Sequence, residues 1–66
     1  MAVARVTKIT ASSNKGWEDA ANQGLKRAAD TVRGITGFEV TSQKAKVKDG
    51  KIAEYRITME VTFVLE

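Results

Sequence analysis

The chain has 66 residues and a formal net charge of +3, from 11 basic and eight acidic side chains, and it contains neither cysteine nor histidine. This composition excludes disulfides, thiolate metal centres and every catalytic arrangement that depends on Cys or His. No apolar run approaches the ~18 residues of a membrane span and no signal-peptide pattern opens the chain, so we expect a soluble, cytoplasmic protein without a membrane partner. A single domain of this size is expected to gain stability by self-association.

The first half of the chain predicts a strand followed by a helix. Residues 1–10 favour a strand because β-branched residues recur among polar ones. Residues 11–16 have the composition of a loop, and Gly16 suits a helix N-cap. Residues 17–33 predict an amphipathic helix, with Gly34 placed for a left-handed C-cap. Small residues dominate the apolar stripe of this helix, so we expect it to lie close to a sheet.

The second half predicts a hairpin. Strands at 38–47 and 51–65 are joined by Asp49-Gly50, a dipeptide typical of a type I′ turn. From Ile52 onward apolar and polar residues alternate, which indicates a strand with one buried face. At ~3.3 Å per residue this strand spans roughly 46 Å, whereas a compact domain of this length has a radius of gyration near ~11 Å. Either the strand coils strongly around a partner element, or its far end contacts another chain.

Connectivity predicts an α+β fold over residues 1–66. The order is β-α-β-β, and the long strand lies between the other two and antiparallel to both, giving the strand order 1-3-2. A two-residue turn pairs residues whose numbers sum to 99, so Phe38 faces Val61 beneath the helix. At the hairpin end the same face then presents Lys44 opposite Tyr55. We expect that end to be wet or covered by a neighbouring subunit.

Two features stand out on the sheet face away from the helix. Glu39 is expected opposite Glu60, a like-charge pair that is destabilising unless the side chains splay into solvent, another subunit supplies an Arg, or a hard divalent cation binds. Gln43 is expected opposite Arg56, in a row of hydrogen-bonding groups. This row is either a solvated surface or, in an oligomer, the lining of a small-molecule pocket. No carboxylate pair has a spacing diagnostic of acid-base chemistry, so we do not expect an enzyme.

A series of short segments runs through essentially the whole chain: Gly16–Ala20, Arg27–Val32, Gly37–Val40, Asp49–Ile52 with Tyr55, and Val61–Glu66. No segment alone is specific. In this order and at this spacing they resemble the dodecin family of small flavin-binding proteins. The resemblance implies a protomer whose sheet partly wraps its helix, and a hollow homododecamer of cubic 23 symmetry.

The resemblance also implies a ligand site. Dodecins bind riboflavin, FMN or FAD in pairs at two-fold interfaces, and they store, buffer or quench the flavin rather than use it in catalysis. A Trp directly before the Phe-Glu-Val segment stacks on the flavin, and a Gln after the Tyr of the long strand holds the polar edge of the ring. These positions are Gly37 and Arg56 here. Lys44 and Val64 stand where the family commonly has Arg.

Three functions therefore stay open at the level of sequence. The first is storage or sequestration of a flavin or another anionic small molecule, with Gly37, Gln43, Lys44 and Arg56 as candidate ligand contacts. The second is a dodecameric shell that has lost the flavin and binds a cation at Glu39 and Glu60, or serves a structural role. The third, nucleic-acid binding, ranks last because the basic hairpin has only Tyr55 as an exposed stacking aromatic, so we expect no nucleic-acid partner.

Overall fold

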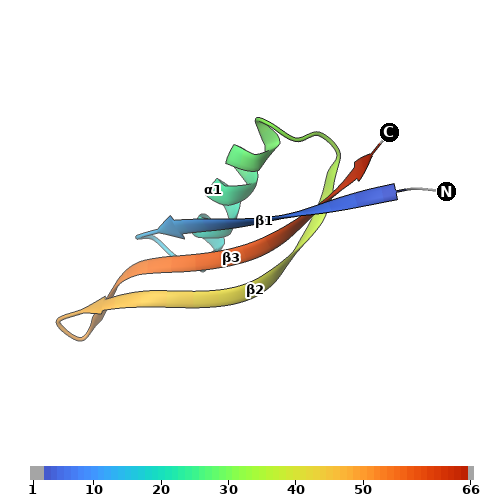
Figure 1. Cartoon of the computed structure of the whole chain (residues 1–66). Coiled ribbons are helices and arrows are strands. Elements are labelled where there is room, and N and C mark those ends of the chain that lie inside the picture. The colour runs from blue at the N-terminus through green and yellow to red at the C-terminus, as the bar shows by residue number, and fades with distance from the viewer. Residues whose placement is uncertain (1–2, 66) are drawn as a thin grey trace.

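The computed structural model describes residues 3–65 of the chain (Figure 1). Its elements are β1 (Val3–Ser13), α1 (Trp17–Ala29), β2 (Ile35–Lys48) and β3 (Lys51–Leu65). The strands form one antiparallel three-stranded sheet in the order β1-β3-β2, with α1 on one face. This confirms the predicted β-α-β-β topology. Met1, Ala2 and Glu66, which the sequence placed in the first strand and the last matching segment, lie outside the described residues.

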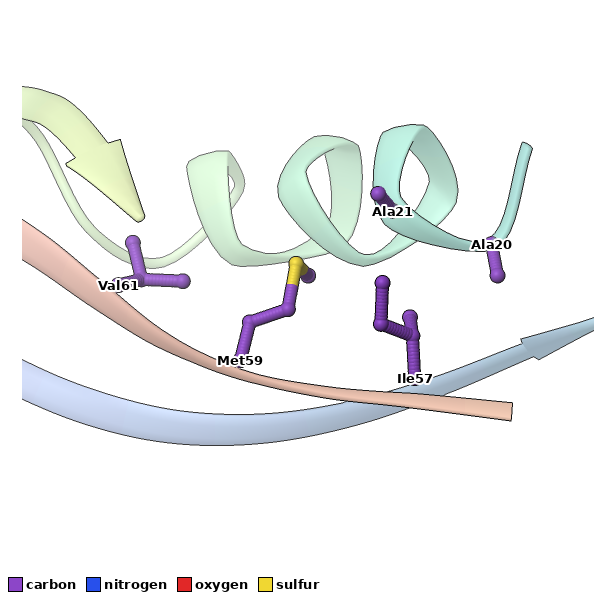
Figure 2. Packing of buried hydrophobic residues seen from close by; sticks show 5 residues of the cluster. All are labelled: Ala20, Ala21, Ile57, Met59 and Val61. Atoms are coloured by element: carbon purple, nitrogen blue, oxygen red, sulfur yellow. The ribbon is translucent and has the colours of Figure 1, made fainter. Parts of the chain in front are cut away.

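A small apolar core joins α1 to the centre of β3, as Figure 2 shows. Its five buried side chains are Ala20, Ala21, Ile57, Met59 and Val61. Burial of each large aliphatic side chain contributes roughly 1.5–3 kcal/mol. Gly24 lies in the same interface, where a Cβ would fall 2.8 Å from Met59 Cε and 3.1 Å from Ala11 Cβ. The small helix residues therefore do let the helix lie close to the sheet.

The helix covers only part of the sheet. It lies chiefly against β1 and β3. Phe38 and Val40 of β2 each remain 42% exposed, although they pair with the buried residues Val61 and Met59. The predicted pairing of Phe38 is thus confirmed, but its predicted burial beneath the helix is wrong because α1 lies over the other two strands. An apolar strip of β2 is left uncovered in the protomer.

The helix is shorter than the sequence predicted. It ends at Ala29 rather than Arg33. The backbone N–H and the hydroxyl of Thr31 both donate to the carbonyl of Ala28, at 3.1 and 3.3 Å, and this tightening closes the last turn. Gly34 has the predicted left-handed conformation, with φ 77°, but it is the last residue of the connection before β2 and does not cap the helix. No helix among residues 3–65 is long and apolar enough to cross a membrane.

The outer strands are longer than predicted. β1 continues to Ser13, so the loop expected at 11–16 shrinks to the three residues before α1. β2 begins at Ile35 rather than at Phe38. The extra length follows from β3, which offers a pairing partner along nearly its whole length and reaches Ser13 through Tyr55. The predicted bounds of the long strand, 51–65, are confirmed.

The β2–β3 hairpin contains three irregularities: one between Ile35 and Gly37, and two nearer the turn that offset each other. Asp49 and Gly50 have φ values of 54° and 76°, which confirms the type I′ turn. The predicted register holds beside this turn and again near Val40, but not between them. Thr41 is an extra residue in β2, and Ala53 is an extra residue in β3. Every pair between these two bulges is displaced by one residue from the prediction.

The protomer is elongated. It measures 51 × 20 × 13 Å with a radius of gyration of 13.6 Å, against ~11 Å for a compact chain of this length. In Figure 1 the β2–β3 hairpin curves and continues past the end of β1, away from the helix and the chain termini. The long strand therefore extends beyond the core, as its length predicted, and no other element among residues 3–65 covers its hairpin end.

Candidate functional site

The sheet face opposite α1, termed the outer face, carries its side chains in rows of three, with one residue from each strand. The rows follow from the two strand registers and use the even-numbered residues of β3. Listed as β1–β3–β2, from the terminal end toward the hairpin, they are Val6–Thr62–Gly37, Lys8–Glu60–Glu39, Thr10–Thr58–Ser42 and Ser12–Arg56–Lys44. All the candidate site residues except Gln43 lie in these rows.

Gly37 is an open position on the outer face. It is exposed, and a Cβ built there would meet nothing within 4 Å. Its φ lies outside the left-handed region, where Gly34 and Gly50 are found. The backbone therefore does not require glycine at position 37, and a larger side chain fits there without moving a neighbour.

Arg56 is held by an ion pair with its neighbour on the same strand face. Its Nη2 lies 2.9 Å from Oε1 of Glu54, and Nζ of Lys46 lies 3.9 Å from the other carboxylate oxygen. The Arg56 side chain is 46% exposed, and that of Glu54 is 29% exposed. Pairs at this exposure contribute only about 0–1 kcal/mol to stability. Their main effect is to fix the direction of the guanidinium group.

The bulge at Thr41 decides which residue lies beside Arg56. The predicted Gln43–Arg56 pair is wrong, because Gln43 pairs with Ile57 and so belongs to the helix side of the sheet. Lys44 pairs with Arg56 instead. Among the described residues Lys44 forms no ion pair. The row nearest the hairpin therefore places two cations side by side, with the Ser12 hydroxyl on the other flank of Arg56.

Tyr55 lies on the helix side of the sheet. It pairs with Ala45, so the predicted Lys44–Tyr55 pair is wrong for the same reason. The ring of Tyr55 contacts that of Trp17 edge to face, with centroids 5.0 Å apart and planes at 79°. The two aromatics thus pack against each other at the start of α1. Neither belongs to the rows of the outer face.

The like-charge pair is confirmed: Glu39 lies opposite Glu60. On its other side Glu60 pairs with Lys8 of β1, which sets a cation in the same row and offsets the repulsion. Glu39 is exposed and Glu60 partly exposed, so both carboxylates can turn into solvent. Within residues 3–65 no three potential metal-ligating side chains gather closely enough to hold an ion in one protomer.

Hydroxyl groups fill the row between the carboxylates and the cations. The hydroxyls of Thr10 and Thr58 are hydrogen-bonded at 3.1 Å, and the hydroxyl of Thr41 donates to the Thr58 carbonyl at 3.3 Å. Sequence reasoning did not assign Ser12 or Glu54 to the site. Ser12 was missed because the first strand was ended at residue 10. The signal for Glu54 was its spacing of two from Arg56, which places both on one strand face.

Gly37 and Arg56 share the outer face but not the same part of it. Their rows are set by Thr62 and Arg56 of β3, six residues apart. At ~3.3 Å per residue this separation is roughly 20 Å. A single protomer therefore does not bring the two positions to one small ligand.

The comparisons with known proteins agree along the whole chain. The family model described as Dodecin matches residues 3–66. The chain is 31% identical to dodecin of Thermus thermophilus over 64 residues, covering 97% of this chain and 93% of that protein. It is 36% identical to calcium dodecin of Mycobacterium tuberculosis over 63 residues, covering 96% and 89%.

Solved structures share the fold. Dodecin from Streptomyces davaonensis superposes with a TM-score of 0.91 at 35% identity, covering 98% of this chain and 96% of that one. A T. thermophilus dodecin variant gives 0.94 at 30% identity, with 100% and 98% covered. Calcium dodecin of M. tuberculosis, a calcium-chelating antigen with a novel calcium-binding site, gives 0.81 at 38% identity, with 97% and 91% covered.

Proposed function

Because the chain belongs to the dodecin family, as its sequence resemblance indicated, we propose that it stores or sequesters a flavin between the subunits of a hollow homododecamer. The protein acts by binding, and it catalyses no reaction on the flavin. One observation carries the proposal: the open position at Gly37 and the cationic row at Arg56 occupy opposite ends of one exposed sheet face. That arrangement becomes one site when two outer faces meet.

Assembly is supported by what the protomer leaves exposed. Among residues 3–65 the core has five buried apolar side chains, while the uncovered strip of β2 keeps two large apolar residues 42% exposed. At the ends of the hairpin and of β3, Val47, Ile52 and Leu65 are 67%, 49% and 46% exposed. A domain of this size with so small a core is stabilised when further copies cover these surfaces.

A two-fold axis completes the ligand site. We place this axis in the interface between the outer faces of two subunits. It runs across the strands, midway between the Gly37 row and the Arg56 row. Such an axis reverses the strand direction, so the open space at Gly37 of one copy lies over the Arg56 row of the other. A planar ligand would then fill the space at Gly37 and meet hydrogen-bond donors at its polar edge. The guanidinium of Arg56 is planar and always charged, so it can stack on a ring or donate to one.

A second candidate function is binding of a divalent cation. The confirmed Glu39–Glu60 pair supplies two carboxylates, and the calcium dodecin of M. tuberculosis is a relative at 36% identity. The same two-fold axis would place the carboxylates of one copy near the hydroxyl row of Thr58 in the other. Carboxylate and hydroxyl oxygens suit a hard cation such as Ca²⁺.

Titration with riboflavin, FMN and FAD tests the leading proposal. We expect flavin fluorescence to be quenched until one flavin is bound per protomer, in a particle whose light-scattering mass corresponds to a dodecamer. No quenching by any of the three flavins would contradict flavin storage. In that case calorimetric titration with Ca²⁺ tests the second candidate, with Glu39→Gln as the variant that should lose the binding.

A further inference from the structure

The positive charge of this protein is concentrated in one segment. Five of the 11 basic side chains and two of the eight acidic ones lie between residues 44 and 56, so this segment carries a net charge of +3, equal to that of the whole chain. The remaining charges balance. The β2–β3 hairpin is therefore the part of the protomer that attracts anions.

The row that Arg56 and Lys44 of this segment form with Ser12 of β1 is suited to contact an anion. Cross-strand neighbours have Cβ atoms about 4.5–5.5 Å apart, so the two cationic groups can reach one small ligand. Arg56 and Lys44 are both exposed. Guanidinium and ammonium groups only donate hydrogen bonds, and the Ser12 hydroxyl can donate as well. No carboxylate belongs to this row.

The carboxylate of Glu54 already engages Arg56 and therefore competes with an anion for its guanidinium group. Only Nη2 of the guanidinium is within 2.9 Å of that carboxylate, and four further N–H donors belong to the group. The other Glu54 oxygen faces Lys46 at 3.9 Å, so the carboxylate is shared between two cations. Glu54 therefore holds the guanidinium in one direction and leaves part of its fork available to a second acceptor.

Resting on the flavin-binding function proposed above, we propose that this row binds a phosphate monoester, and that the site takes FMN in preference to riboflavin. Arg56 is the specificity-determining residue, since its planar fork matches two phosphate oxygens. Lys44 supplies a second charge, and Glu54 is a positioning residue that acts through Arg56. A ligand without a phosphate offers these two cations no compensating charge.

The test compares FMN with riboflavin on four proteins that must first give the same far-UV spectrum and mass: the parent, Arg56→Gln, Glu54→Gln and the control Lys48→Gln. We expect the parent to bind FMN about tenfold or more tighter than riboflavin at low salt. Arg56→Gln should remove that preference, because it weakens FMN binding more than riboflavin binding. Lys48→Gln makes the same charge change near the turn, outside the row, and should keep the preference.

Glu54→Gln separates positioning from simple charge. If Glu54 only offset the positive charge, its removal would raise FMN affinity. If it aims the guanidinium, its removal lowers FMN affinity several-fold although a negative charge is lost, and this is the result we expect. A rise would overturn the positioning role of Glu54.

Titration with inorganic phosphate, followed by phosphorus NMR, separates this inference from the flavin function. Phosphate binding that Arg56→Gln abolishes, with no flavin bound, would keep the phosphate site and refute flavin storage. Equal affinity of the parent for FMN and riboflavin, unchanged in Arg56→Gln, would overturn the phosphate site and leave flavin storage standing. Failure of phosphate and of both flavins to bind would overturn both.

Discussion

Met59 lies so close to Gly24 that a Cβ at the glycine would fall 2.8 Å from the terminal methyl carbon of the methionine. The same Cβ would be 3.1 Å from Cβ of Ala11, which cannot turn aside as a flexible side chain can. Met59 is fully buried and has little room to move. This contact sets how near α1 lies to the sheet.

We expect Gly24→Ala to destabilise the protein by roughly 1 kcal/mol. Replacing a helical glycine by alanine gains up to about 1 kcal/mol of helix propensity, but overpacking a core costs about 1–3 kcal/mol. Because the nearest atoms include a rigid Cβ, the overpacking should prevail. Chemical denaturation measures the difference, with the exposed helix position Asn22→Ala as control. Stabilisation by Gly24→Ala would show that the helix can move away from the sheet at no cost.

Phe38 should matter to the assembly more than to the protomer. Its side chain is 42% exposed beside Val61, which is fully buried beneath α1. We expect Phe38→Ser to reduce the particle mass in light scattering, because it removes apolar surface that only another copy can cover. Val61→Ala should instead lower stability by about 2 kcal/mol through loss of buried surface. A Phe38→Ser protein of unchanged mass would contradict this assignment of the β2 strip.

Asp19 in the first turn of α1 accepts two hydrogen bonds, one that ties the helix to β1 and one from within the helix. The buried hydroxyl of Ser13 donates to its Oδ2, and Nε2 of Gln23 donates to the same oxygen at 2.6 Å. The backbone N–H of Lys15 donates in turn to the Ser13 hydroxyl at 2.9 Å. The Ser13 bond and then the Gln23 bond lower the pKa of Asp19 below its ordinary 3.8; burial opposes them with a smaller effect, and the Lys15 charge adds the smallest lowering effect.

The sign of this shift predicts a loss of stability in acid. A carboxyl whose pKa is lower in the folded state than in the unfolded state stabilises the fold at every pH above its unfolded pKa, and that contribution is lost as the pH falls through the folded pKa. Asp19→Asn should therefore reduce the melting temperature at neutral pH and flatten its decline below pH ~4. Glu18→Gln, an exposed neighbour, is the matched control. An unchanged acid limb in Asp19→Asn would disprove the role of this carboxylate.

Gly37→Trp should raise the affinity for riboflavin. The space at Gly37 is open, and a stacking aromatic contributes roughly 1–3 kcal/mol per ring. Desolvation of the indole and of the neighbouring outer face should reduce this gain. Quenching of flavin fluorescence measures it, and an affinity no better than that of the parent would show that position 37 does not border the ligand.

Combining Gly37→Trp with Arg56→Gln tests the proposed two-fold site. The glutamine should restore a neutral hydrogen-bonding edge for the ring. Within one protomer the two positions are roughly 20 Å apart, and effects at that distance add. Across the proposed axis they border one ligand, so their effects on riboflavin affinity should not add. Strict additivity would refute the axis.

The sequence predicted the topology well because local signals agreed with each other. Alternation through Ile57, Met59 and Val61 predicted the buried face of β3, and the Asp49-Gly50 dipeptide predicted its turn. The turn alone could not reveal the bulge in β2. A change of phase was the available signal, since the apolar residues of the second strand change from even to odd numbers between Val40 and Ala45.

The remaining errors arise from backbone bonding at the helix end and from missing neighbours. At the end of the helix the backbone N–H groups of Asp30 and Thr31 bond to the carbonyls three residues back, a change that periodicity does not encode. The burial of Phe38 was mispredicted because the sequence pattern shows that a face is apolar but not which element covers it. For the same reason the ligand pocket could not be predicted from the sequence of one chain. In the proposed two-fold interface its two halves belong to different subunits.

The bulge at Thr41 also bears on how the sheet ends. Within residues 3–65, β2 pairs on one side only, so its other edge could be extended by a strand from a second chain. The extra residue at Thr41 interrupts and bends that edge, and three lysines follow it before the turn: Lys44, Lys46 and Lys48. Like charges aligned along a bent edge oppose strand-by-strand growth. Edge-to-edge assembly into open-ended fibres is therefore disfavoured. Contacts through the sheet faces remain, and such contacts can form a closed oligomer.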